Sequence, residues 1–174
     1  EDDGSVSRAI SRNFNKILRA PMLTFRNCLL VDVPPNNAKT INLLNTGTIN
    51  IEHLRGVQNV IIKGCNLNDF RPLVNCLYFR SENTGILDVT HMTSVRTMKL
   101  LNEPIQEIIN LNKLTHLFLN ECMETINISN LPELRKLSIT DCDTISSISN
   151  VKKLMYLEVK SSNVLNISNC NHNV

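Results

Sequence analysis

Three consecutive stretches of the sequence, LNKLTHLFLNECMETINISN (111–130), LPELRKLSITDCDTISSISN (131–150) and VKKLMYLEVKSSNVLNISNC (151–170), align without gaps at 20 residues each. Their shared pattern is L-x-x-L-x-x-L-x-L-x-x-C, followed by an aliphatic residue and then by I-x-N. Self-similarity at a fixed short period is the signature of a repeat architecture. A single repeat of this length cannot bury its own apolar face, so neighbouring repeats must stack around a common core. The sequence therefore predicts a solenoid.

The L-x-L segment recurs upstream of these stretches and predicts one short strand in each repeat. Its copies are Leu23/Phe25, Ile41/Leu43, Val60/Ile62, Leu77/Phe79, Met98/Leu100, Leu117/Leu119, Leu137/Ile139 and Leu157/Val159. Alternation within the segment points two side chains toward the core and the residue between them toward solvent. A second aliphatic residue follows 10 to 12 residues behind each copy, which makes about eight repeats of 17 to 21 residues. Strands stacked at about 4.8 Å would form one parallel sheet.

With this pattern, residues 20–170 resemble the leucine-rich-repeat family, and the short period resembles its internalin and bacterial-effector types. The resemblance implies an α/β repeat solenoid that is mainly β, with right-handed parallel winding and no α-helix on its convex side. The residue three after the L-x-L is normally Asn or Cys in that family. The corresponding residues here are Cys28, Thr46, Cys65, Glu82, Glu103, Cys122, Cys142 and Ser162. Glu82 and Glu103 depart from the family pattern, so we expect an irregular coil in the middle of the solenoid.

The two ends of the chain differ from the repeats between them. Val6, Ile10, Phe14 and Ile17 recur at helical spacing, which predicts an amphipathic capping helix over residues 1–19 and a solenoid over residues 20–174. A membrane-surface or partner-binding helix is the alternative. Residues 170–174 show no capping pattern, so we expect the last repeat to be covered either by further repeats or by a partner.

Composition and motifs argue against several classes of function. The net charge of +2 is too small for a nucleic-acid binder that neutralises phosphates, and no apolar run is long enough to span a bilayer. The GxSxG, GxxxxGK[ST], GxGxxG and HExxH motifs are absent, and no Cys/His cluster has zinc spacing. We therefore expect no catalytic residue, cofactor, metal, nucleic acid or membrane partner.

The cysteines and asparagines follow the repeat. Four of the six cysteines occupy the ladder position three after the L-x-L, where a thiol can bond to backbone groups of the turn. We expect reduced thiols, which favour an intracellular setting. Asn127 and Asn166 begin glycosylation sequons that would count only in a secreted protein. An asparagine closes the later repeats at residues 110, 130, 150 and 169, and we expect these side chains to form an internal stack.

The outward-facing strand positions are the candidate binding site. Ile61, Tyr78, Leu101 and Phe118 are expected in the middle of the sheet. The flanking basic residues are Lys63, Arg80, Lys99 and His116. Solvent-facing positions that only kept a sheet soluble would be polar throughout, whereas apolar anchors within a basic rim are typical of a protein-binding surface. Scattered exposed apolar residues, which are common on any protein surface, are the alternative interpretation.

The leading hypothesis is a non-catalytic protein-binding module whose concave parallel sheet binds a partner with an acidic surface. One alternative is a structural subunit of a large assembly, in which both the sheet face and the C-terminal edge are covered. A second alternative is a secreted adhesin or effector that binds a host protein or glycan.

Overall fold

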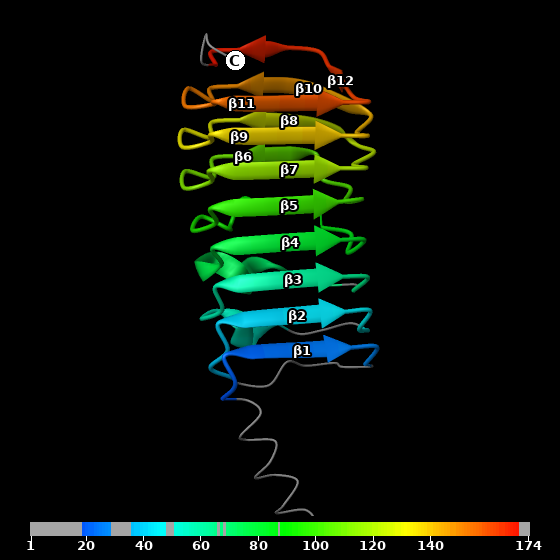
Figure 1. Ribbon diagram of the computed structural model, residues 1–174, viewed down its shortest axis with the longest axis vertical. Helices are drawn as coiled ribbons and strands as arrows, with labels where there is room; N and C mark the ends of the chain where they lie inside the picture. The colour runs from blue at the N-terminus through cyan, green and yellow to red at the C-terminus, as the bar shows by residue number, and fades with distance from the viewer. Residues whose placement is uncertain are drawn as a thin grey trace, which may run out of the picture.

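The computed structural model describes residues 19–28, 36–47, 51–65, 67, 69–86 and 88–170. Within these ranges the chain is a parallel β-solenoid, whose coils stack along the long axis in Figure 1. Apart from its last residue, the capping helix predicted over residues 1–19 lies outside the described residues.

One sheet of eight parallel strands forms the front of the solenoid in Figure 1, in the order β1-β2-β3-β4-β5-β7-β9-β11. Its strands are β1 (Met22–Arg26), β2 (Thr40–Leu44), β3 (Asn59–Lys63), β4 (Tyr78–Glu82), β5 (Thr97–Leu101), β7 (His116–Asn120), β9 (Lys136–Thr140) and β11 (Tyr156–Lys160). Each strand is five residues long and pairs in register with the next. The predicted strand in each repeat is therefore confirmed.

A second, shorter sheet covers the opposite side of the later coils. It contains β6 (Glu107–Ile109), β8 (Thr125–Ser129), β10 (Thr144–Ser149), β12 (Asn163–Val164) and β13 (Ile167–Ser168). Two short 3-10 helices, η1 (Glu52–Leu54) and η2 (Arg71–Asn75), occupy this side of earlier coils. They are the only helices among the described residues, as the short period predicts. No helix in the described ranges is both long and apolar enough to span a membrane.

The core lies between the two sides and consists mainly of branched aliphatic side chains. In β7 and β9, Leu117, Leu119, Leu137 and Ile139 are all at most 1% exposed, while the residues between them face solvent. The back sheet contributes further buried residues such as Ile128. The alternation that predicted inward and outward positions is therefore confirmed in these strands.

Each front strand ends in a turn that requires a left-handed backbone. In every coil, the second inward-facing residue of the front strand is followed two positions later by a residue with φ between 49° and 59°. These residues are Asn27, Asn45, Gly64, Asn83, Asn102, Glu121, Asp141 and Ser161. Glycine and asparagine adopt this conformation more easily than other residues, which explains why they hold five of the eight positions.

In the fourth repeat, the inward-facing residues of the strand differ from those that the sequence predicted. Phe79, not Leu77, pairs with Val60 and Met98, so the two inward residues of β4 are Phe79 and Ser81. Leu77 precedes the strand. The L-x-L pattern favoured the earlier pair because Leu77 and Phe79 are both apolar, whereas the true second inward residue is a serine. The ladder position three residues later is therefore Thr84 rather than Glu82.

A buried polar cluster explains how serine is accommodated in this core. Ser81, Thr84 and Glu103 are at most 4% exposed. The Ser81 hydroxyl donates to Glu103 Oε1 at 2.7 Å, and the backbone N–H groups of Thr84 and Ile86 donate to the same carboxyl group. Glu103 thus acts as a ladder residue that joins two coils. The irregular coil expected here does not interrupt the front sheet, since β4 and β5 pair along their full length.

The ladder cysteines bond to backbone carbonyls, as predicted. The Cys65 thiol donates to Leu43 O in the preceding coil and to Lys63 O in its own coil, at 3.4 and 3.2 Å. All six cysteines are free. The repeat-closing asparagines differ from expectation: Asn130 and Asn150 bond to each other through their side chains at 2.8 Å but are exposed. Both have positive φ, at a corner whose side chains remain in solvent.

Candidate functional site

The outer face of the front sheet consists of three rows of side chains that run along the solenoid axis. The strand register defines the middle row as Ile61, Arg80, Lys99, Phe118, Ser138 and Glu158. The row nearer the strand starts is Asn59, Tyr78, Thr97, His116, Lys136 and Tyr156. The row nearer the strand ends is Lys63, Glu82, Leu101, Asn120, Thr140 and Lys160.

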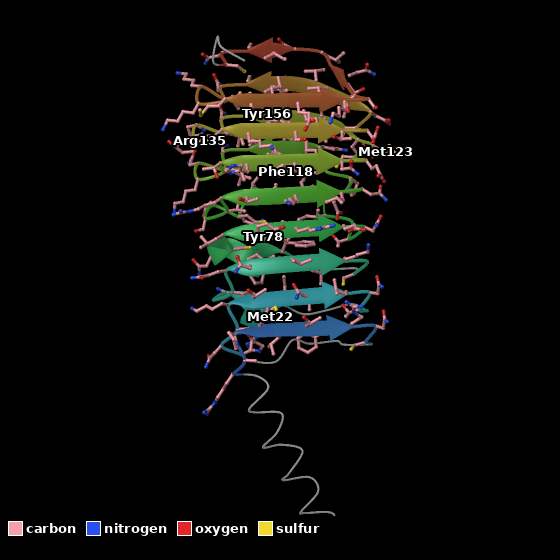
Figure 2. The ribbon with its side chains drawn as sticks, in the orientation of Figure 1. Met22, Tyr78, Phe118, Met123, Arg135 and Tyr156 are labelled. Atoms are coloured by element: carbon pink, nitrogen blue, oxygen red, sulfur yellow. The ribbon has the colours of Figure 1, made fainter. Side chains whose placement is uncertain are left out.

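Two neighbouring residues of the middle row and two of the row nearer the strand starts form a contiguous group. We call this group the lysine–aromatic row: Lys99, Phe118, Lys136 and Tyr156. Lys99 Nζ lies 5.0 Å from the centre of the Phe118 ring, and Lys136 Nζ lies 5.5 Å from the same ring. Lys136 Nζ is also 4.5 Å from the centre of the Tyr156 ring. Each distance is within the range of a cation–π interaction. Figure 2 shows Phe118 and Tyr156 on the front of the later coils.

The two carboxylates of this face are already paired with cations. Glu82 accepts from Lys63 at 2.5 Å and from Arg80 at 3.2 Å, and the Lys63 hydrogen bond is the main reason that its pKa is lowered. Glu158 accepts from Lys160 at 2.5 Å and from the Ser138 hydroxyl at 2.9 Å. The Lys160 hydrogen bond contributes most to the lowered pKa of Glu158.

Lys99 and Lys136 differ from the other cations of the face. Within the described part of the chain, no ion pair includes either ammonium group. Each ammonium group lies over at least one aromatic ring, which attracts a cation without neutralising its charge, and Lys136 is also close enough to Glu158 to lower the pKa of that carboxyl group slightly. Both ammonium groups can therefore accept a carboxylate from another molecule.

A shallow depression of about 290 Å³ lies beside these lysines. It crosses four strands, because its lining includes Arg80 from β4, Lys99 from β5, Phe118 from β7 and Ser138 from β9. Its long direction therefore follows the solenoid axis rather than the strands. The depression combines an aromatic ring, basic groups and hydroxyls in one open surface.

The predicted site residues all face outward, but they do not form a single cluster. Arg80, Lys99, Leu101 and Phe118 line the depression together. Ile61 and Lys63 lie on β3 beyond it, and His116 is exposed in the row near the strand starts. Tyr78 was predicted in the middle row beside Phe118; the phase of the fourth repeat places it instead in the row of His116, and Arg80 takes the middle position.

Sequence reasoning missed two members of the lysine–aromatic row. Lys136 and Tyr156 lie in the same row as His116 on the next two strands, so the repeat phase already placed them on this face. The missing information was the side-chain conformation that brings Lys136 over the Phe118 ring of the neighbouring strand.

A second hollow, of about 330 Å³, lies away from this face between two coils. Asp69, Arg71, Asp88 and His91 are among the residues that line it. Asp69 is bonded to Arg71, and Asp88 to Thr90. Neither ring nitrogen of His91 has a hydrogen-bond partner in the described ranges. No group of three or more His, Cys, Asp or Glu side chains that could hold a metal occurs there.

Cys122 and Cys142 are neighbouring ladder residues in the core. A hydrogen bond from the Cys122 thiol is the main cause that lowers the pKa of Cys142 to about 7. The same contact, followed by burial, raises the pKa of Cys122. Both side chains are at most 1% exposed, so the pair is not accessible to a substrate.

Comparisons of the chain with protein-family models, with curated proteins and with solved structures find no match.

Proposed function

We propose that this chain is a non-catalytic protein-binding module of leucine-rich-repeat type, and that the outer face of its front sheet binds a protein partner with an acidic surface. The observation that carries the proposal is the lysine–aromatic row beside the depression on β4, β5, β7 and β9. Aromatic side chains are enriched in the cores of protein interfaces, and basic groups around them attract an acidic partner. The solenoid core gains nothing from Phe118, because this ring is on the solvent side of β7.

The leucine-rich-repeat assignment draws on the repeat pattern and on two features of the fold. The front sheet is continuous and parallel, and the ladder thiols bond to backbone carbonyls of the preceding coil. The opposite side of the coils has short strands and 3-10 turns, which suits the short-period types named above.

The test pairs stability with capture of a partner. Phe118→Ala and Tyr78→Ala should each change the free energy of unfolding by no more than about 0.5 kcal/mol, as for other surface substitutions. Phe118→Ala should weaken binding of the captured partner by about 2 kcal/mol or more, the range of a hot spot. The partner is found by pull-down and mass spectrometry with the unaltered chain, and its affinity is then measured for each variant.

Two exposed methionines serve as controls. Met22→Ala removes an apolar side chain from the far end of the same face, and Met123→Ala removes one from the turn that follows β7, at the right-hand edge in Figure 2. Neither variant should change the affinity. Unchanged binding in Phe118→Ala would show that the partner uses another surface.

A second candidate function is a structural subunit, because the last coil exposes apolar side chains that are buried in the coil before it. Val159 and Ile167 are 38% and 51% exposed, whereas the equivalent Ile139 and Ile148 are fully buried. A chain whose last coil is covered in an assembly should self-associate when isolated. Sedimentation velocity at increasing concentration separates the two: a monomer at all concentrations favours the binding module, and progressive association favours the subunit.

A further inference from the structure

The depression on the front sheet has a direction that restricts what can occupy it. Its lining residues come from four neighbouring strands but extend over only a few residues of each. Three intervals of about 4.8 Å between strands give a length of about 14 Å along the solenoid axis. An extended segment of four or five residues covers this length at about 3.1 to 3.3 Å per residue. The occupant would cross the strands rather than add to the sheet, because the strands that line the depression are already paired on both sides.

The ammonium groups of Lys99, which lines the depression, and of Lys136, which lies beside it in the row nearer the strand starts, set a second spacing. Lys99 is on β5 and Lys136 is on β9, with β7 between them, so their strands are about 10 Å apart. In a polyproline II segment, residues three apart project in the same direction and are about 9 Å apart. Phe118 lies between the two lysines and contacts both ammonium groups. The backbone between two acidic residues at this spacing would pass over its ring, because the two intervening side chains project to either side.

From these observations, we propose that the lysine–aromatic row binds an extended acidic segment that runs along the solenoid axis, with two carboxylates three residues apart held by Lys99 and Lys136 and the backbone between them packed over Phe118. The inference rests on the proposed function and specifies its partner. The rings hold both ammonium groups in place before binding, which reduces the entropy lost when the carboxylates bind.

The charges of the surrounding surface favour a peptide over a nucleic acid. The outer face of β3 to β11 carries five Lys and Arg side chains and two Glu side chains, which suits a partner with a few negative charges. The turns at the strand ends carry exposed carboxylates at Glu121 and Asp141. These carboxylates beside the depression repel the closely spaced charges of a phosphate backbone more strongly than the two charges of a short peptide.

The probe for the test is a fluorescein-labelled peptide in which two glutamates are separated by a leucine and a proline. The proline favours the extended conformation, and binding is followed by fluorescence anisotropy. Replacing both glutamates by glutamine should weaken binding at least about tenfold, and placing them next to each other should weaken it by a similar factor. Equal affinity for both spacings would overturn the proposed geometry.

Variants of the chain test where on the solenoid the peptide binds. Lys99→Ala and Lys136→Ala should each weaken binding about five- to tenfold, while Lys113→Ala, which removes an exposed charge outside the face, should not. The sharper test is a charge exchange. The Lys136→Glu variant should no longer bind the original peptide. It should instead bind one of the two peptides in which a single glutamate is replaced by lysine. Failure of both exchanged peptides to bind would contradict a direct contact with Lys136.

The remaining outcomes separate this inference from the proposed function. If no acidic peptide binds but Phe118→Ala still loses the captured partner, the face binds protein and the acidic segment is wrong. If Phe118→Ala keeps the captured partner, the proposed function itself is wrong. A single-stranded oligothymidylate that binds through Lys99 and Lys136, when the peptide does not, would overturn the inference in favour of a nucleic acid.

Discussion

Among substitutions that leave every apolar core residue in place, removal of the Glu103 carboxyl group should cause one of the largest losses of unfolding free energy. The side chain is 1% exposed and accepts hydrogen bonds from the end of β4 and the turn that follows it in the coil before. Its Oε1 accepts from the Ser81 hydroxyl at 2.7 Å, from the Thr84 hydroxyl at 3.0 Å and from the Thr84 N–H at 3.1 Å. Its Oε2 accepts from the Ile86 N–H at 3.1 Å.

The magnitude follows from the donors that lose their acceptor. Glu103→Ala leaves the N–H groups of Thr84 and Ile86 buried without a partner, and each such group costs about 1 to 3 kcal/mol. The Ser81 hydroxyl can still bond to the Thr84 hydroxyl, so it adds little. The expected loss of unfolding free energy is therefore about 2 to 6 kcal/mol. Glu103→Gln keeps one oxygen but turns an amide N–H₂ toward a donor, so about 1 to 3 kcal/mol should be lost.

The assay is urea denaturation followed by circular dichroism, with Glu107→Ala as the matched control because Glu107 is exposed on the neighbouring strand β6. The control should be within about 0.5 kcal/mol of the unaltered chain. A loss below about 1 kcal/mol in Glu103→Ala, or a glutamine variant that is less stable than the alanine variant, would refute the reasoning. Either result would mean that water or another group satisfies these donors.

Three further changes test other parts of the structure by the same assay. Leu117→Ala should cost about 2 to 5 kcal/mol, because a fully buried aliphatic side chain is removed, and a loss below about 1 kcal/mol would contradict its inward position. Gly64→Ala should cost about 1 to 2 kcal/mol because φ is +59° there, whereas Gly56→Ala, with open space around the new Cβ, should be neutral or stabilising. The lowered pKa of Glu82 means that its ion pairs stabilise the fold above the ordinary pKa of a glutamate, and that this contribution is lost as the pH falls through the lowered value. Glu82→Gln should therefore show a weaker loss of stability between neutral and acidic pH, and an unchanged acid profile would contradict the pairing with Lys63 and Arg80.

The repeat made most of the fold predictable. In residues 111–170 the three gapless copies assigned every inward position of β7 and β9, and the structure confirms them at Leu117, Leu119, Leu137 and Ile139. The short period predicted the scarcity of helix, since too few residues separate successive strands for an α-helix to form. The outward position of Phe118 followed from alternation alone, and the structure confirms it.

Where prediction failed, the missing information was a contact between residues in different coils. Ser81 is a poor core residue by type, so the pattern favoured Leu77 and Phe79 as the inward pair; its burial depends on Glu103, 22 residues later, which accepts its hydrogen bond. The asparagines at the later corners were expected inside because the repeat places them beside buried residues. Their positive φ directs the side chains into solvent instead, where Asn130 and Asn150 bond to each other.

The sequence by itself determined the architecture, because the repeated spacing of apolar residues specifies which side chains must be buried and how far apart successive strands lie along the chain. It also determined that Phe118, Lys99 and Lys136 are on one face. Only the tertiary structure decided that Lys136 reaches the Phe118 ring from the next strand and that neither Lys99 nor Lys136 forms an ion pair among the described residues. The physical reason is that strand alternation restricts only the side of the sheet on which a residue lies, whereas the position of a long charged side chain depends on its neighbours in adjacent coils, which are about 20 residues away in sequence and about 5 Å away in space.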